Sequence, residues 1–80
     1  MKLRLIIQLK QGVLDPQGKA INHALHNLSF NEVKDVRVGR VVDLELSEMS
    51  VSEAKKKTTK MAQNLLANSV IEDFEVEVLS

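Results

Sequence analysis

The chain has 80 residues, no cysteine, and 11 basic side chains balanced by 11 acidic ones. This length predicts one domain, residues 1–80, which buries only about 60 to 65% of its unfolded surface and therefore needs a further source of stability. Without cysteine that source is neither a disulfide nor a thiolate metal site, which leaves self-association. The balanced charge argues against nucleic acid or an anionic membrane as a partner.

The N-terminal residues alternate between apolar and polar side chains. Leu3, Leu5, Ile7 and Leu9 are separated mostly by charged or amide side chains, a period of two that is typical of a half-buried strand. The charges that interrupt this short apolar run, and the absence of a small-residue cleavage site, argue against a leader or a membrane span. We therefore expect a strand in a cytoplasmic protein.

Asp15 and Pro16 predict the start of the first helix. The Asp side chain can accept from free backbone N–H groups, and proline fixes φ at the first helical position. The helix is expected to run from about residue 16 to residue 28. Its apolar positions fall on one stripe, formed by Ala20, Ile21, Ala24, Leu25 and Leu28.

The next apolar pattern, residues 33–46, predicts one long middle strand. Its even positions include Val36, Val38, Val42, Leu44 and Leu46, and this parity continues through Gly39 and Arg40. Arg40 gives little support for a two-residue hairpin turn, so a single strand with a kink at the glycine is favoured. At about 3.3 Å per residue it would span roughly 45 Å, longer than so small a domain needs. Part of this strand is expected to pair outside its own subunit.

Ser50 and Glu53 fit a capping box and predict the start of a second helix. Its expected buried stripe comprises Ala54, Met61, Ala62, Leu65 and Leu66. Asn68 is expected to close the helix in the left-handed conformation. The last strand is predicted where Phe74, Val76 and Val78 alternate with Asp73, Glu75 and Glu77.

The order of these elements is β-α-β-α-β. The polar sides of the first and last strands have opposite charge, which favours their pairing as antiparallel neighbours. We therefore predict an α+β fold, an antiparallel sheet with two helices on one face, related to a ferredoxin-like domain whose two middle strands are fused. Fusion leaves a place in the sheet that the strand of a second subunit can fill, so an oligomer is expected.

No residues form a convincing catalytic, cofactor or metal site. The residues from Gly12 to Lys19 depart from a phosphate loop in spacing, and Pro16 removes an N–H group that such a loop uses. His23 and His26 lie one helical turn apart but have no third ligand nearby in the sequence. We therefore predict no catalytic residue, and a stand-alone enzyme is not supported.

Arg40 stands out because the parity of the middle strand places it among the inward-facing apolar positions. A lone inward arginine indicates a partner, either a carboxylate of a second subunit or an interface between protein chains. A β-bulge at Gly39 would instead turn the side chain out to solvent. The sequence leaves both alternatives open.

The chain resembles the PurS family, the small subunits of phosphoribosylformylglycinamidine synthase, over nearly its whole length. The motifs that carry the resemblance are Val13-Leu14-Asp15-Pro16-Gln17-Gly18-Lys19-Ala20, Ala24-Leu25-His26, Asn31-Glu32-Val33 with Asp35-Val36-Arg37-Val38-Gly39, and Leu65-Leu66-Ala67-Asn68 with Val70-Ile71-Glu72-Asp73-Phe74. The blocks are specific in combination, whereas each alone is weak.

The resemblance implies a non-catalytic subunit of a glutamine-dependent carbon–nitrogen ligase complex in purine biosynthesis. Such a subunit bridges a glutaminase, which releases ammonia, and a synthetase, which uses ATP to convert formylglycinamide ribonucleotide to formylglycinamidine ribonucleotide. It assists ammonia transfer between them. No cofactor is implied in this subunit, while ATP and magnesium are expected in the synthetase. Homodimers or dimers of dimers are implied as well.

Two segments are expected at subunit contacts. They comprise Asp15, Pro16, Gln17, Gly18 and Lys19 in the first, and Arg37, Gly39 and Arg40 in the second. The alternative function is a small regulatory domain that binds a metabolite between paired subunits, by analogy with other ferredoxin-like modules.

Overall fold

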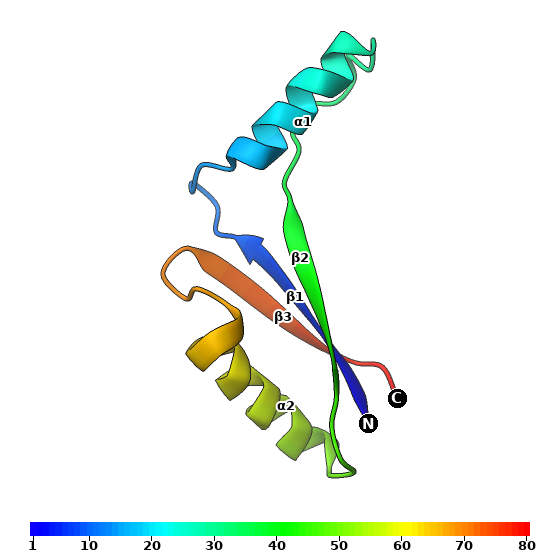
Figure 1. The fold of residues 1–80 in the computed structure, drawn as a ribbon, viewed down its shortest axis with the longest axis vertical. Helices are drawn as coiled ribbons and strands as arrows, with labels where there is room; N and C mark the ends of the chain where they lie inside the picture. Colours follow the sequence, from blue (N-terminus) through cyan, green and yellow to red (C-terminus); the bar gives the residue numbers. More distant parts are fainter.

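A computed structural model describes all 80 residues of the chain. Along the chain lie strand β1 (Lys2–Leu9), helix α1 (Pro16–Asn27), strand β2 (Gly39–Glu45), helix α2 (Val51–Met61), the π-helical turn η1 (Ala62–Leu66) and strand β3 (Glu72–Val78) (Figure 1). The predicted β-α-β-α-β order is confirmed. None of the helices is long and apolar enough to cross a membrane.

The three strands form one antiparallel sheet in the order β2-β1-β3. The first and last strands are therefore neighbours, as their opposite charges predicted, and Arg4 lies opposite Glu77 in the register. The apolar side of β1 forms the centre of the core, because Leu3, Leu5 and Ile7 are completely buried. The period of two in the sequence thus corresponds to one covered face and one open face of the sheet.

Helix α2 covers the apolar face of this sheet. It begins where Ser50 Oγ accepts a hydrogen bond from the Glu53 N–H at 3.1 Å, the forward half of the predicted capping box. Ala54, Thr58 and Ala62, spaced one helical turn apart, are fully buried against the strands. Small side chains at these positions let the helix approach the sheet closely.

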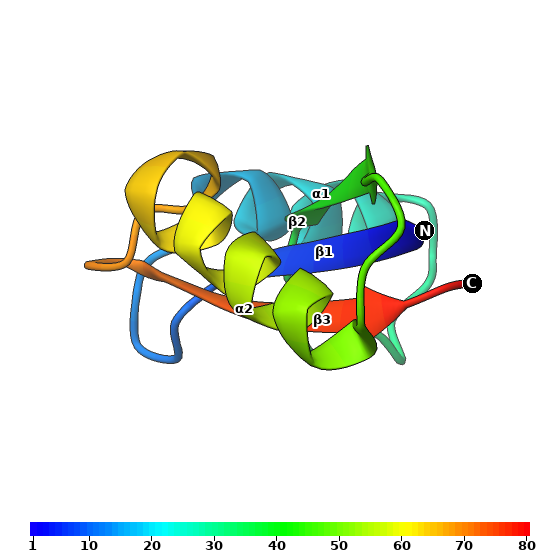
Figure 2. The same ribbon diagram turned by 90° about the horizontal axis from the view of Figure 1, so that it is seen from below.

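Helix α1 does not lie over the sheet of its own chain. It extends beyond the end of the strands, so that the molecule is elongated, with dimensions of 49 × 26 × 14 Å (Figures 1 and 2). The prediction that both helices cover one face thus holds for α2 alone. Most of the predicted apolar stripe of α1 is exposed, with Leu28 67% and Ile21 40% accessible.

The predicted long strand over residues 33–46 is shorter in the structure, because β2 starts at Gly39. The register explains the difference: Gly39 lies opposite Gln8, almost at the end of β1, after which the chain turns away toward α1. Residues 33–38 therefore have no neighbouring strand in this chain, although they continue the line of β2 (Figure 1). The register is continuous from Gly39 onward, which rules out the alternative of a β-bulge at this glycine.

The end of the second helix also differs from the prediction. The π-helical turn η1 widens the last helical turn and rotates the following side chains, so Leu65, predicted to be buried, is 83% exposed. Asn68 does not take the left-handed conformation, since Ser29 is the only non-glycine residue with positive φ. The helix ends instead at Ala67, in extended backbone.

Candidate functional site at the junction of α1 and β2

Asp15 joins the start of α1 to the segment that precedes β2. One carboxylate oxygen accepts from the Gly18 N–H at 2.9 Å, as an N-cap, and the other accepts from the Val38 N–H at 2.8 Å. Two hydrogen bonds lower the pKa of Asp15 below its ordinary value, and the bond from the Val38 N–H has a larger effect than that from the Gly18 N–H. Because the side chain is buried, these contacts position the helix rather than a ligand.

Arg37 makes the reciprocal connection between the same two parts of the chain. Its guanidinium donates to the carbonyl oxygen of Leu9 at 3.1 Å, at the end of β1, and to those of Lys10 at 3.0 Å and Val13 at 3.3 Å in the connection to α1. Arginine suits this role because its planar group presents several donors in a fixed geometry. Asp15 and Arg37 together hold the α1 arm at a defined angle to the sheet.

Gly18 is required by the close approach of α1 to residues 33–38. A Cβ atom at this position would lie 2.2 Å from the backbone carbonyl oxygen of Val36. Farther along the helix, His26 Nε2 contacts the Val33 carbonyl oxygen at 2.7 Å. Both His23 and His26 lie on α1. The chain has no group of three or more His, Cys, Asp or Glu side chains that could hold a metal ion.

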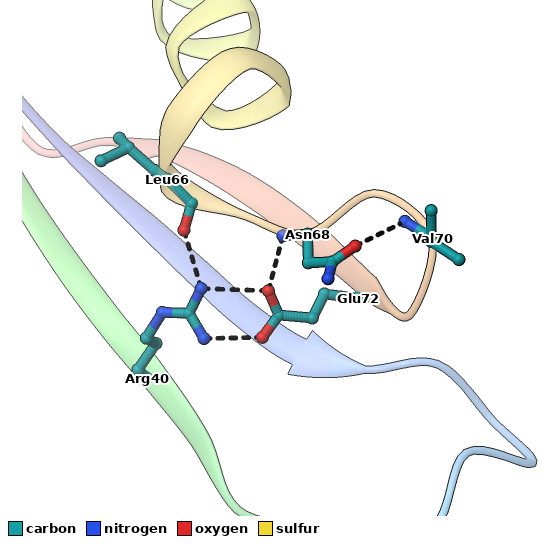
Figure 3. A network of polar contacts seen from close by, with 5 residues as sticks. All are labelled: Arg40, Leu66, Asn68, Val70 and Glu72. Atoms are coloured by element: carbon teal, nitrogen blue, oxygen red, sulfur yellow. Dashed lines mark hydrogen bonds and ion pairs between the residues drawn. The ribbon is translucent and has the colours of Figure 1, made fainter.

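Arg40 points to the α2 face of the sheet and pairs with a carboxylate of its own chain. Its guanidinium makes a bidentate ion pair with Glu72, at 2.6 and 3.0 Å, and donates to the Leu66 carbonyl oxygen at 2.7 Å. Figure 3 shows the two side chains meeting across β1, with the Asn68 N–H donating to the same carboxylate at 2.7 Å. The inward orientation of Arg40 is therefore correct, but its carboxylate partner belongs to the same chain and not to a second subunit as expected.

The Arg40–Glu72 pair lowers the pKa of the carboxyl group and raises the pKa of the guanidinium. The hydrogen bond from Arg40, and next that from Asn68, holds the pKa of Glu72 below its ordinary value of 4.5. Glu72 is nearly buried, whereas about half of the Arg40 side chain is exposed. The guanidinium thus has an accessible side on the surface of the molecule.

The structure brings the residues predicted at subunit contacts to one region. Pro16, Gln17, Gly39 and Arg40 line a hollow of about 300 Å³ between the start of α1 and the end of β1. Lys19 and Arg37 line a neighbouring hollow of about 260 Å³, and Asp15 borders both. Both hollows lie on the surface of the molecule, at the junction of α1 and β2.

Sequence reasoning missed Glu72 and Asn68 as partners of Arg40. The signal was present in part, because the parity of the last strand places Glu72 on the same face as Phe74 and Val76. An inward glutamate on one strand and an inward arginine on another indicate a pair. The contact of Arg40 with the Leu66 carbonyl had no such signal, because it depends on the π-helical turn.

Comparison with known proteins agrees with this architecture. Residues 2–80 match the family model described as PurS, phosphoribosylformylglycinamidine (FGAM) synthase. The chain is 46% identical over 77 residues to the synthase subunit PurS of Bacillus subtilis, covering 96% of this chain and 90% of that protein. It is 40% identical over 77 residues to PurS of Methanocaldococcus jannaschii, covering 96% and 93%.

Solved structures show the same fold. A crystal structure of B. subtilis PurS matches with a TM-score of 0.87 and 44% identity, covering 99% of this chain and 98% of that one. The structure of PurLQS from Thermotoga maritima contains a chain that matches with a TM-score of 0.88 and 31% identity, covering 98% and 95%. The chain therefore belongs to the PurS family of phosphoribosylformylglycinamidine synthase subunits of purine biosynthesis.

Proposed function

We propose that this chain is a non-catalytic, bridging subunit of a synthase complex with PurL-like and PurQ-like partners, acting in the cytoplasm. The T. maritima relative is part of a PurLQS structure, which supports the same kind of assembly here. In this assembly the glutaminase releases ammonia, and the synthetase uses ATP and magnesium to place it on formylglycinamide ribonucleotide. The small subunit holds the two together and so assists ammonia transfer.

The observation that carries this proposal is the large apolar surface that the chain leaves uncovered. The stripe of α1 faces solvent at Ile21, Ala24 and Leu28 instead of packing on the sheet. An exposed apolar stripe of this kind marks a protein interface. An elongated molecule with such a surface is an assembly component, not a self-sufficient enzyme.

We propose further that a second copy covers this surface. Residues 33–38 lie next to the edge strand β2 and are paired with no strand of this chain, so another strand can add at this edge. The inner face of β2, at Val42 and Leu44, is only half-buried under α2 and can receive the α1 stripe of the partner. Each copy would then complete the other, which gives a homodimer; a dimer of dimers requires a further contact between two such homodimers.

Reconstitution tests the bridging role. Product formation from glutamine is measured with the two larger subunits in the presence and absence of this chain, with ammonium chloride as the nitrogen source in a control. We expect glutamine-dependent synthesis to require the chain, and ammonia-dependent synthesis to depend on it much less. Equal glutamine-dependent rates with and without the chain would show that the proposal is wrong.

Light scattering of the isolated chain tests self-association. Ile21→Lys combined with Leu28→Lys places charges on the α1 stripe and is expected to convert the oligomer to monomer. Leu65→Lys, which changes an exposed leucine outside the stripe, is the control and is expected to leave the mass unchanged. A wild-type chain that is monomeric at all concentrations would contradict the proposal.

A further inference from the structure

The face of the sheet opposite α2, here called the open face, has an apolar centre that no element of this chain covers. Ile6 on β1 lies directly opposite Val41 on β2 in the register, and Val41 is 57% exposed. Helix α2 covers the other face, and α1 lies beyond the end of the strands (Figure 1). Ile6 itself is half-buried, so most of the exposed apolar surface of this centre belongs to Val41. Apolar surface at the middle of an open sheet face is typical of the centre of a contact surface.

Carboxylates surround this centre in excess over cations. The open face carries Asp43, Glu45, Asp73, Glu75 and Glu77, against Lys2 and Arg4 within the strands and Lys10 just beyond them. Arg4 pairs with Asp43 at 2.8 Å and Lys10 lies 3.8 Å from Asp73. The remaining three carboxylates have no cation within 4 Å and stay available to a partner.

The cations that balance these carboxylates lie on the other side of the molecule. The net charge is zero, so the compensating cations lie elsewhere. Four of them, Lys55, Lys56, Lys57 and Lys60, are exposed on α2, on the opposite side of the sheet. The two broad surfaces of this thin molecule therefore differ in sign.

A second copy is a poor occupant for the open face. Two open faces related by a twofold axis would place carboxylates against carboxylates, and like charges across an interface cost affinity. The lysines of α2 in a second copy would match in charge, but that contact is heterologous and would build rings or filaments instead of a twofold dimer. Self-association through α1 and β2, as proposed above, also leaves this face free.

From the apolar centre, the unpaired carboxylates and the exclusion of a second copy, we infer that the open face docks on a basic surface of one of the larger subunits. This inference rests on the proposed function, since it identifies the surface through which the small subunit binds a partner. Apolar contacts of Ile6 and Val41 would form the centre of that interface, and Lys or Arg side chains of the partner would face Glu75 and Glu77.

Protection of a sheet edge is the competing explanation for these carboxylates. Charged side chains on an edge strand such as β3 discourage pairing with other chains. This explanation accounts for the carboxylates of both edge strands, β2 and β3, but not for the exposed apolar side chain of Val41 beside Ile6. It also predicts a different experimental result, which is aggregation of charge-removing variants without loss of partner binding.

The test compares two double variants of the full chain that change the net charge equally. Glu75→Lys with Glu77→Lys reverses the open face, and Glu48→Lys with Glu53→Lys changes exposed carboxylates near the start of α2. Affinity for each larger subunit is measured at 50 and 500 mM sodium chloride. We expect the open-face variant to bind one of the subunits about tenfold or more weakly at low salt, with a smaller difference at high salt, and the control to bind within about twofold of wild type.

Each other outcome has a defined meaning. Unchanged affinity of the open-face variant for both subunits would overturn the inference while leaving the proposed function intact. A wild-type chain that binds neither subunit would instead refute the proposed function. A change in homo-oligomer mass would assign the face to a second copy and also overturn the inference. If the double lysine variant fails to fold, Glu75→Gln with Glu77→Gln is tested in the same way, with a loss of about threefold expected.

Discussion

Replacing Gly18 by alanine tests whether the approach of α1 to residues 33–38 is as close as the structure indicates. At an open helical position alanine is favoured over glycine by about 1 kcal/mol. Here the new Cβ would lie 2.2 Å from the Val36 carbonyl oxygen and 2.8 Å from Asp15 Oδ2. Ordinary van der Waals contact begins at 3.4 Å, so the first distance is more than 1 Å too short. Because the nearest atom belongs to the backbone, it cannot rotate away, and the helix must shift instead.

This shift determines the expected magnitude. Overpacking of a rigid site costs about 1 to 3 kcal/mol, and a displaced helix also weakens the hydrogen bond between Asp15 and Val38. After the helix-propensity gain is subtracted, we expect Gly18→Ala to lower the free energy of unfolding by about 1 to 2 kcal/mol. In a domain of this size each kcal/mol corresponds to a Tm decrease of about 4 to 8 °C.

Urea unfolding followed by circular dichroism measures this loss at a fixed protein concentration, since self-association shifts the apparent stability. Gln17→Ala, an exposed position in the same helical turn, is the control and is expected to change stability by less than about 0.5 kcal/mol. A Gly18→Ala variant as stable as wild type would refute the reasoning. It would mean that α1 and residues 33–38 are farther apart in solution.

The remaining predictions concern the core and the Arg40–Glu72 pair. Thr58 is fully buried and its hydroxyl has no hydrogen-bond partner, so Thr58→Val is expected to raise the free energy of unfolding by about 1 kcal/mol in urea titrations; a loss would show that the hydroxyl is bonded. Arg40→Met should lower stability by about 1 kcal/mol, a modest amount because half of the side chain is exposed, and an unchanged urea midpoint would contradict this. Because the pKa of Glu72 is lowered in the folded state, its contribution is complete above the unfolded value near 4.5 and is lost as the pH falls through the folded pKa. Glu72→Gln should therefore differ from wild type most above pH 4.5 and converge toward it in acid, and a constant difference would refute the assignment.

Some of these substitutions are expected to change assembly as well as stability. Substitutions at Gly18 or Asp15 change the angle of the α1 arm, whereas Thr58 acts within the core under α2. Variants of the first kind should therefore disturb assembly at protein concentrations where the sheet remains folded. Light scattering combined with circular dichroism separates the two effects.

Local patterns in the sequence were sufficient for most of the secondary structure. Alternation over residues 2–9 and 73–78 predicted β1 and β3, because side chains of a strand point to opposite faces with a strict period of two. Asp15 with Pro16, and Ser50 with Glu53, predicted both helix starts, because capping depends on residues within one turn. The motifs that indicated the family lie in the same continuous segments.

Contacts between distant segments were decided only by the tertiary structure. The pairing of Arg40 with Glu72 joins residues 32 positions apart, and the parity of each strand gives a face but not the identity of the neighbour. Residues 33–38 have the composition of a strand, yet they pair with no strand of this chain because β1 ends before reaching them. The position of α1 beyond the sheet has the same cause: an amphipathic stripe specifies that a helix face must be covered, while the arrangement of the whole chain decides what covers it.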